Sequence, residues 1–287
     1  MDLIRLTRPV DFALLLAAVL LGGWLAAGSG AALAPAAVRL SVAALATGLI
    51  GVAANVVNDI YDIEIDRHNA PHRPLAAGHV TVGAAWALWA VLSGLGTILA
   101  FGVSAPHGVI AVSAVALLWA YAVTLKRVAG VGHAVVGIAV AIGLLFGAFV
   151  VEPGVAPPVW AGALLTFVLV STREVVKAIP DIRGDRAAGA QTIPTLLGPR
   201  RAAFIAIWVL AGTIAAMPLL TRVGFEPMIL AYVLPMCGLV LAALWILWST
   251  DALERAGPVG WATCATRASA TMKWALAAGV VALALGR

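Results

Sequence analysis

The sequence predicts an all-α, polytopic membrane protein: a single domain over residues 1–287, with nine transmembrane helices in a bundle around a central cavity that opens to the cytoplasmic side. Two observations predict this fold class. The chain is 63% hydrophobic and only 11% charged, with a mean hydropathy of +1.04, whereas about a quarter of the residues of a water-soluble domain are charged. In addition, apolar runs of about twenty residues, the length that crosses roughly 30 Å of hydrocarbon, recur along the whole chain.

The apolar runs follow one another with short breaks that are rich in glycine, proline or charge. The first run could be read as a signal peptide, but it lacks a convincing small-residue cleavage site and further spans follow it, so we expect it to be retained. No stretch long enough for a soluble domain is left between the runs, so the membrane bundle itself must hold the function. The nine expected spans cover residues 10–28, 36–58, 82–103, 107–124, 131–151, 158–177, 201–221, 227–249 and 268–286.

Lysine and arginine are distributed unequally between the two faces that nine spans create. Of the 18 such residues, all but Arg39, Arg222 and Arg287 fall on the face that receives the N-terminus and the loops after the even-numbered spans. These cations prefer the cytoplasmic side, so we expect an integral protein of the cell membrane with its N-terminus inside and its C-terminus outside. The net charge of +5 then reflects this asymmetry and attraction to anionic lipid headgroups, and not nucleic-acid binding.

Four acidic side chains lie within eight positions of the segment NDIYDIEIDRHNAPHRPLAAG, residues 58–78. Asn55, Asp59, Asp62 and Asp66 are spaced by four, three and four positions. At about 100° per residue they fall within one narrow arc, provided that the helix of the second span continues past the membrane edge. Carboxylates arranged in this way repel one another unless a cation lies among them.

Mg²⁺ is the cation that this all-oxygen cluster favours. It prefers oxygen ligands and commonly binds through one or two carboxylates plus the phosphates of a substrate, whereas zinc sites in proteins are usually built with His or Cys. Asn58 and Glu64 point away from the shared arc. The alternative interpretation is a solvated helix end with intrahelical salt bridges to Arg67 or Arg73.

A second acidic segment, STREVVKAIPDIRGDRAAGAQTIPTLLG, covers residues 171–198. Glu174, Lys177, Asp181 and Asp185 repeat the spacing of three and four, but Pro180 disfavours an unbroken helix through them. We therefore expect the sixth span to end near Lys177 and a new turn to begin at Pro180, with Asp181 and Asp185 one turn apart. Two acidic clusters on one side of the membrane, each accompanied by Arg and Lys, are typical of a site where metal ions hold a diphosphate.

The segments NDIYDIEID and DIRGD resemble the two signature motifs of the UbiA superfamily of intramembrane prenyltransferases. The resemblance extends to Arg8–Pro9, to RPLAAG at 73–78, to YAVTLKR at 121–127 and to the nine-helix layout. It implies Mg²⁺-dependent transfer of a polyprenyl group, which we expect to be geranylgeranyl, from its diphosphate to a lipophilic acceptor in the membrane. Two Mg²⁺ ions are the expected cofactor.

The resemblance also implies roles for individual residues, to which Asn55 is added from its place on the shared arc. Many relatives carry a further Asp where this chain has Ala178, so one metal ion would have fewer protein ligands here. Metal binding and catalysis are expected of Asp59, Asp62, Asp66, Asp181 and Asp185. Substrate binding is expected of Asn55, Asn58, Arg67, Arg73, Tyr121, Lys126 and Lys177.

The acceptor is suggested by the residues around the second motif. Its GD and the following GA-x-TIP-x-LLG are more similar to archaeal digeranylgeranylglyceryl phosphate synthases, homogentisate prenyltransferases and chlorophyll synthases than to the 4-hydroxybenzoate branch of the family. REVVK and the short chain favour the first of these, with geranylgeranylglyceryl phosphate as acceptor. The alternative is an aromatic, quinone-precursor or chlorophyll-type acceptor.

An ion-coupled secondary transporter is the alternative from another class. The two acidic loops, at about 58–80 and 174–200, suggest two pseudo-repeated halves, and transporters are often built from internal repeats. Transporter sites, however, lie near the membrane midplane, whereas these carboxylates lie at the ends of spans. The sequence leaves the oligomeric state open.

Overall fold

The helices of the computed structural model begin where the sequence supplies capping residues and prolines. Helix α6 (Val82–Val103) begins after Thr81, whose side chain accepts a hydrogen bond from the Ala84 amide, and Ser104 caps α7 (Ala105–Val123) in the same way. Ser and Thr in extended backbone are favoured at this position because they satisfy a free amide of the first turn. Three further helices begin with proline, which suits the first turn: α2 (Pro9–Ala27), α9 (Pro157–Lys177) and α12 (Pro199–Ala216).

The structure describes residues 2, 6–152, 155–187, 189–227, 237–238, 240–241, 245 and 251–285. These residues contain helices and no strand, which confirms the all-α prediction. Eight helical segments among them are long and apolar enough to cross a membrane, and they correspond to eight of the expected spans. The expected span at 227–249 lies mostly outside the described residues, so the count of nine stays a prediction. The eight segments are Pro9–Ala27, Gly30–Tyr61, Val82–Val103, Ala105–Val123, Val131–Val151, Pro157–Lys177, Pro199–Val223 and Thr263–Leu285.

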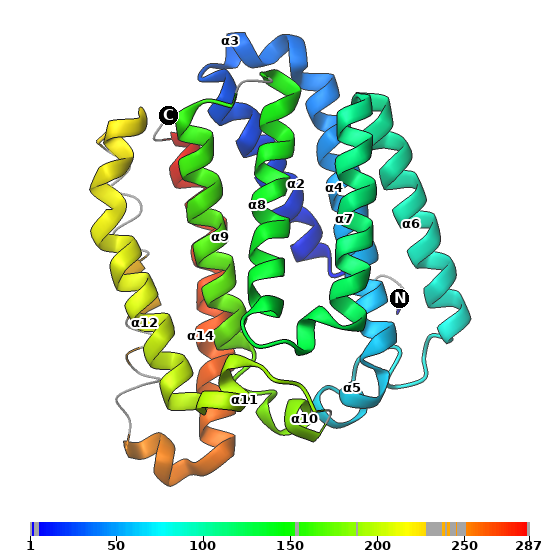
Figure 1. The fold of residues 1–287 in the computed structure, drawn as a ribbon, viewed down its shortest axis with the longest axis vertical. Helices are drawn as coiled ribbons and strands as arrows, with labels where there is room; N and C mark the ends of the chain where they lie inside the picture. The colour runs from blue at the N-terminus through cyan, green and yellow to red at the C-terminus, as the bar shows by residue number, and fades with distance from the viewer. Residues whose placement is uncertain are drawn as a thin grey trace. The chain divides into compact units, whose positions relative to one another are not determined.

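Residues 1–125 and 142–155 form one compact unit. At its centre is α4 (Ala37–Tyr61), against which α2, α6 and α7 all pack (Figure 1). Small side chains let helices approach closely. In lipid no hydrophobic effect drives helices together, so close packing stabilises their association instead. The first acidic motif begins in the last turn of α4, so packing on several sides of this helix positions the start of the motif. The buried core of the unit includes Val19, Leu40, Ala43, Ala46, Ile50, Ala100, Val103, Ala111 and Phe146.

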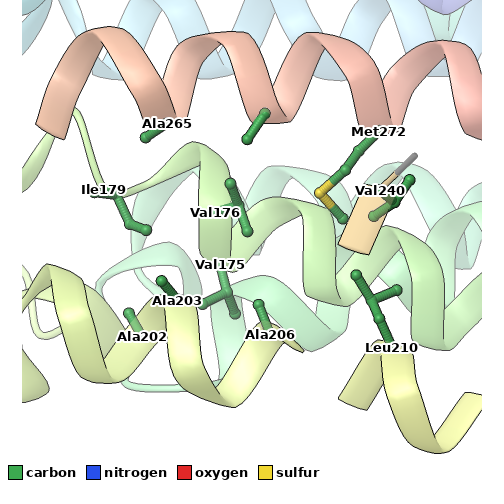
Figure 2. Close-up of a cluster of buried hydrophobic side chains, with 11 residues drawn as sticks. Val175, Val176, Ile179, Ala202, Ala203, Ala206, Leu210, Val240, Ala265 and Met272 are labelled. Atoms are coloured by element: carbon green, nitrogen blue, oxygen red, sulfur yellow. The ribbon is translucent and has the colours of Figure 1, made fainter. Parts of the chain in front are cut away.

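Residues 126–141 and 156–287 form a second compact unit. In it, α9 packs against both α12 and α14 (Asp251–Leu285), a helix that is interrupted at Gly257. Figure 2 shows Val175 and Val176 of α9 between the alanines of α12 and Met272 of α14. Val176 is completely buried in this cluster. Helix α9 ends at Lys177, and the second acidic motif begins four positions later, at Asp181.

Candidate active site

The first acidic motif lies on a helix that continues beyond the predicted membrane edge with one local irregularity. Helix α4 ends at Tyr61, and α5 (Ile63–Asn69) begins after Asp62, whose dihedral angles are φ −99° and ψ 2°. The Asp62 amide still donates to the Asn58 carbonyl at 3.0 Å, and the Asp66 amide donates to the Asp62 carbonyl at 2.7 Å. Helical hydrogen bonding therefore continues through the junction. The prediction that Asn55, Asp59, Asp62 and Asp66 share one arc requires this continuity.

Asp59 and Asp66 are buried and share an arginine. They are only 3% and 5% exposed. Arg73 Nη1 lies 2.9 and 2.7 Å from the two carboxylate oxygens of Asp66, and it also donates to Asp59 Oδ1 at 3.5 Å. The loop that carries Arg73 is anchored by Leu75, which is buried against Val56 of α4. Buried carboxylates require such partners, because an unpaired charge is very costly to remove from water.

Arg8 is a second cationic partner of this cluster. Its guanidinium group forms an ion pair with Asp59 Oδ1 and donates to Asn55 Oδ1 at 3.3 Å. In the sequence, Arg8 belongs to the Arg8–Pro9 pair of the family resemblance, and no separate role is expected of it. Its position could have indicated a role, because Arg8 directly precedes the first expected span and falls on the same face as the acidic motif. The structure brings Asn55, Asp59 and Asp66 together through Arg8 and Arg73.

The remaining residues of the first motif pair locally. Asn58 donates to Asp62 Oδ2 at 2.8 Å, and Arg67 donates to Glu64 at 2.7 Å on the exposed side of α5. Arg67 is thus an exposed partner of Glu64 here, and its expected role in substrate binding stays a prediction. The alternative of a solvated helix end included salt bridges to Arg67 or Arg73, and both arginines do form ion pairs, with Glu64 and Asp66. It does not describe the burial of the carboxylates of Asp59 and Asp66.

Burial changes the protonation equilibria of the loop residues. Removal from water raises the pKa of Asp66 from 3.8 to about 6, although the Arg73 charge opposes the shift. Burial also acts to lower the pKa of Arg73, but the charges of Asp66 and Asp59 outweigh this effect and raise it. Asp66 therefore changes charge near pH 6, in a cluster with an arginine that stays charged.

The second motif has the predicted break. Helix α9 ends at Lys177, and after Pro180 a short helix, α10 (Ile182–Ala187), begins. The Asp185 amide donates to the Asp181 carbonyl at 2.9 Å, so these two aspartates are one turn apart, as expected. Glu174 does not extend this pair. Its carboxylate accepts from Arg173 at 2.9 Å and from the partly exposed Lys177 at 3.1 Å.

The TIP segment after the second motif forms a capped turn. Thr192 caps α11 (Ile193–Leu197) in a reciprocal arrangement with Thr195, and the Gln191 amide donates to the Arg127 carbonyl at 2.9 Å. Arg127 ends the turn that contains Lys126, η2 (Leu125–Arg127), and both bonded residues belong to the second unit. Lys126 is half-buried there, and Tyr121 is half-buried near the end of α7 in the first unit.

The residues of the first motif fit a magnesium ion by the chemistry of their donors. Among the described residues, no three His, Cys, Asp or Glu side chains converge closely enough to hold a metal ion by themselves. Mg²⁺ does not require this, because one or two carboxylates plus substrate phosphates and water suffice. Asp59 and Asp66 supply oxygen donors only, and the guanidinium groups of Arg8 and Arg73 already lie beside them as cations.

Comparisons with known proteins identify the family to which the chain belongs. The model of the UbiA prenyltransferase family matches residues 15–263. The digeranylgeranylglyceryl phosphate synthase of Metallosphaera sedula is 34% identical over 254 residues, which cover 86% of this chain and 84% of that protein. The synthase of the same name from Thermococcus kodakarensis is 35% identical over 250 residues, with 86% and 87% covered.

Solved structures show the same fold. A UbiA homologue from Aeropyrum pernix matches with a TM-score of 0.71 at 22% identity, covering 96% of this chain and 98% of that one. A UbiA homologue from Archaeoglobus fulgidus bound to DMAPP and Mg²⁺ matches with a TM-score of 0.66 at 16% identity, covering 96% and 99%. The family match confirms the resemblance carried by the two acidic motifs and favours the enzyme over the transporter. The chain is an integral-membrane prenyltransferase that belongs to the UbiA family.

Proposed function

We propose that this enzyme transfers a geranylgeranyl group from its diphosphate to geranylgeranylglyceryl phosphate. The observation that carries the proposal is the identity of 34–35% over 86% of the chain to two proteins that are named for this product. The residues around the second motif, noted above, favour the same acceptor. The large share of the chain that is covered supports transfer of the whole activity and not of the fold alone.

We propose that the aspartates of both motifs act on the diphosphate. Asp59, Asp62 and Asp66 would supply one set of magnesium ligands and Asp181 and Asp185 the other, for two ions in all. Bound Mg²⁺ neutralises charge that develops on a leaving diphosphate. The allylic C–O bond then breaks with its electron pair on the diphosphate, the acceptor hydroxyl oxygen forms the new C–O bond, and the hydroxyl proton is released.

The side chains of the polypeptide have two further tasks in this proposal. Arginine and lysine take the remaining charge of the diphosphate: Arg73 lies beside the buried Asp59 and Asp66, and Lys177 directly precedes the second motif. The apolar helices keep water from the allylic cation until the acceptor attacks, and a dry cavity among them would also hold the isoprenoid tail. Asn55, Asn58, Arg67, Tyr121 and Lys126 are proposed as further substrate contacts.

We propose that both units act as one catalytic domain, with the N-terminus and the active site on the cytoplasmic side and the C-terminus outside. The distribution of lysine and arginine supports this orientation, because only Arg39, Arg222 and Arg287 fall on the other face of a nine-span topology. A cysteine placed at either end of the chain, labelled from one side of intact vesicles with a membrane-impermeant maleimide, tests the assignment.

The function is tested with the purified protein and defined substrates. Geranylgeranyl diphosphate and Mg²⁺ are supplied together with geranylgeranylglyceryl phosphate or, separately, with a phenolic acceptor such as homogentisate, and products are identified by mass spectrometry. We expect the diether product only with the glyceryl phosphate and only without EDTA. A product with the phenolic acceptor alone would contradict the proposed acceptor and leave the enzyme class in place.

A further inference from the structure

Arginine side chains already bond three carboxylate oxygens of the first motif. Asp59 Oδ1 is paired with both Arg8 and Arg73, and Arg73 bonds both oxygens of Asp66. Because Asp59 and Asp66 are only 3% and 5% exposed, few routes from solvent lead to these oxygens. A metal ion that binds Asp59 through Oδ1 must therefore displace a guanidinium group.

The charges in this cluster are nearly balanced. Three carboxylates, those of Asp59, Asp62 and Asp66, are accompanied by the two guanidinium groups of Arg8 and Arg73. A divalent cation that enters alone meets repulsion from both guanidinium groups at short range. A diphosphate that enters with it brings the compensating negative charge, and a guanidinium group matches phosphate oxygens as well as it matches carboxylates.

Arg8 is the more readily displaced of the two arginines. Its backbone has φ 45° and ψ 70°, and among the described residues it is the only non-glycine with positive φ. This region is disfavoured for residues with a Cβ, and Pro9 also disfavours the right-handed helical alternative. The Arg8 side chain forms no cap on α2, and its guanidinium group is held by Asp59 and Asn55.

We propose that Arg8 is an exchangeable counter-ion: it neutralises Asp59 until Mg²⁺ binds and then transfers to the diphosphate, which makes metal and diphosphate binding cooperative. The proposal rests on the proposed function, because it takes Asp59 as a magnesium ligand. It assigns Arg8 to diphosphate binding, a role that the residues around it in the sequence do not predict. Arg73 is carried by a loop that is anchored through the buried Leu75, so it stays beside the first motif while Arg8 exchanges.

The test measures Mg²⁺ affinity by isothermal titration of the solubilised full chain, with and without geranylgeranyl thiodiphosphate as an unreactive donor analogue. In the wild type we expect the analogue to tighten Mg²⁺ binding at least about tenfold. In Arg8→Gln we expect Mg²⁺ alone to bind roughly five- to tenfold more tightly, because one repelling charge is gone. In this variant the analogue should increase the Mg²⁺ affinity much less than in the wild type, since the arginine that would have transferred to the analogue is missing.

Two control variants separate charge from structure. Arg8→Lys keeps the cation and should keep Mg²⁺ affinity within about twofold of the wild type, since the point charge remains. Arg39→Gln removes the same charge at the other end of α4, about 30 Å along the helix from Asp59, and should change neither affinity. Unchanged or weaker Mg²⁺ binding in Arg8→Gln would overturn the proposal.

Hydrogen exchange in the wild type provides a readout that does not depend on a folded variant. The amides of Asp11 and Phe12 donate to the Arg8 carbonyl at 2.8 and 3.2 Å. Saturating Mg²⁺ should speed their exchange, because Arg8 loses its anchor, and unchanged exchange would count against the proposal. Failure of the proposed function is a different result: the wild type would then form no prenylated product with any acceptor in the presence of Mg²⁺.

Discussion

The carbonyl oxygen of Val19 on α2 lies directly against Gly147 on α8 (Val131–Val151). A Cβ placed on Gly147 would come within 1.9 Å of that oxygen. Gly22 meets the carbonyl of Leu144 in the same interface, where a Cβ would come within 1.8 Å. These two helices therefore touch backbone to backbone, an approach that only glycine permits and that supplies packing energy in lipid.

Gly147→Ala should destabilise the protein by about 1–3 kcal/mol, because the added methyl group forces α2 and α8 apart. Thermal unfolding of the solubilised protein measures the loss. Gly94→Ala, on α6, is the matched control: a Cβ there has open space around it. It should be neutral or slightly stabilising, since alanine is the better helix former. Equal melting temperatures for the two variants would contradict the close contact.

Val176→Ala should also lower stability, by about 1–3 kcal/mol, because it leaves a cavity where α9, α12 and α14 meet. Val176 is completely buried, whereas Val209 on α12 is 39% exposed. Val209→Ala removes the same atoms from a looser environment and should cost less than half as much. The comparison is made by thermal unfolding of both variants in the same detergent. A larger loss of stability in Val209→Ala than in Val176→Ala would contradict the assignment of Val176 to the core.

Asp59→Asn should reduce Mg²⁺-dependent diphosphate release by roughly 100-fold or more, the usual scale for the loss of one group that stabilises developing charge. Glu64→Gln removes a carboxylate five positions further on, whose partner is the exposed Arg67, and should leave the rate within about twofold. Diphosphate release is measured directly, and the melting temperature of each variant reports folding. Undiminished diphosphate release by Asp59→Asn would show that Asp59 is not a magnesium ligand.

Mg²⁺ binding should weaken by about tenfold between pH 7 and pH 5. Burial raises the pKa of Asp66 to about 6, so below that pH a proton competes with the metal for its oxygens. Titration calorimetry at each pH measures the change, and Asp66→Asn should flatten it.

The same shift affects stability without Mg²⁺. Because the folded pKa is raised, the contribution of Asp66 to stability is complete below 3.8, the pKa of the unfolded chain, and is lost as the pH rises through about 6. Thermal unfolding of the wild type in EDTA should therefore show a falling melting temperature between these values, and Asp66→Asn should show a smaller change. Mg²⁺ should restore the lost stability at pH 7.

Several features of the site followed from the sequence because they depend on local geometry. The spacing of Asn55, Asp59 and Asp66 is a property of one helix, and the structure joins these three through two arginines. The break between Lys177 and Asp181 followed from Pro180, which cannot take part in an unbroken helix. The family resemblance could also be recognised from the sequence, because each of its two motifs is a short continuous segment.

Other features depended on residues that are distant in the chain. Arg8 and Asp59 are 51 positions apart, and only the packing of α2 on α4 decides that the guanidinium group reaches this carboxylate and not another. The burial of Asp59 and Asp66 is likewise a result of how the loop around Leu75 folds onto α4.

The amino-acid sequence by itself determined the membrane environment, eight of the helices and the two acidic motifs, since apolar run length and helical spacing act within short segments. Only the tertiary structure decided which cations neutralise Asp59 and Asp66 and how far these carboxylates lie from solvent. Pairing and burial depend on contacts between helices, and charge spacing along one helix does not specify them.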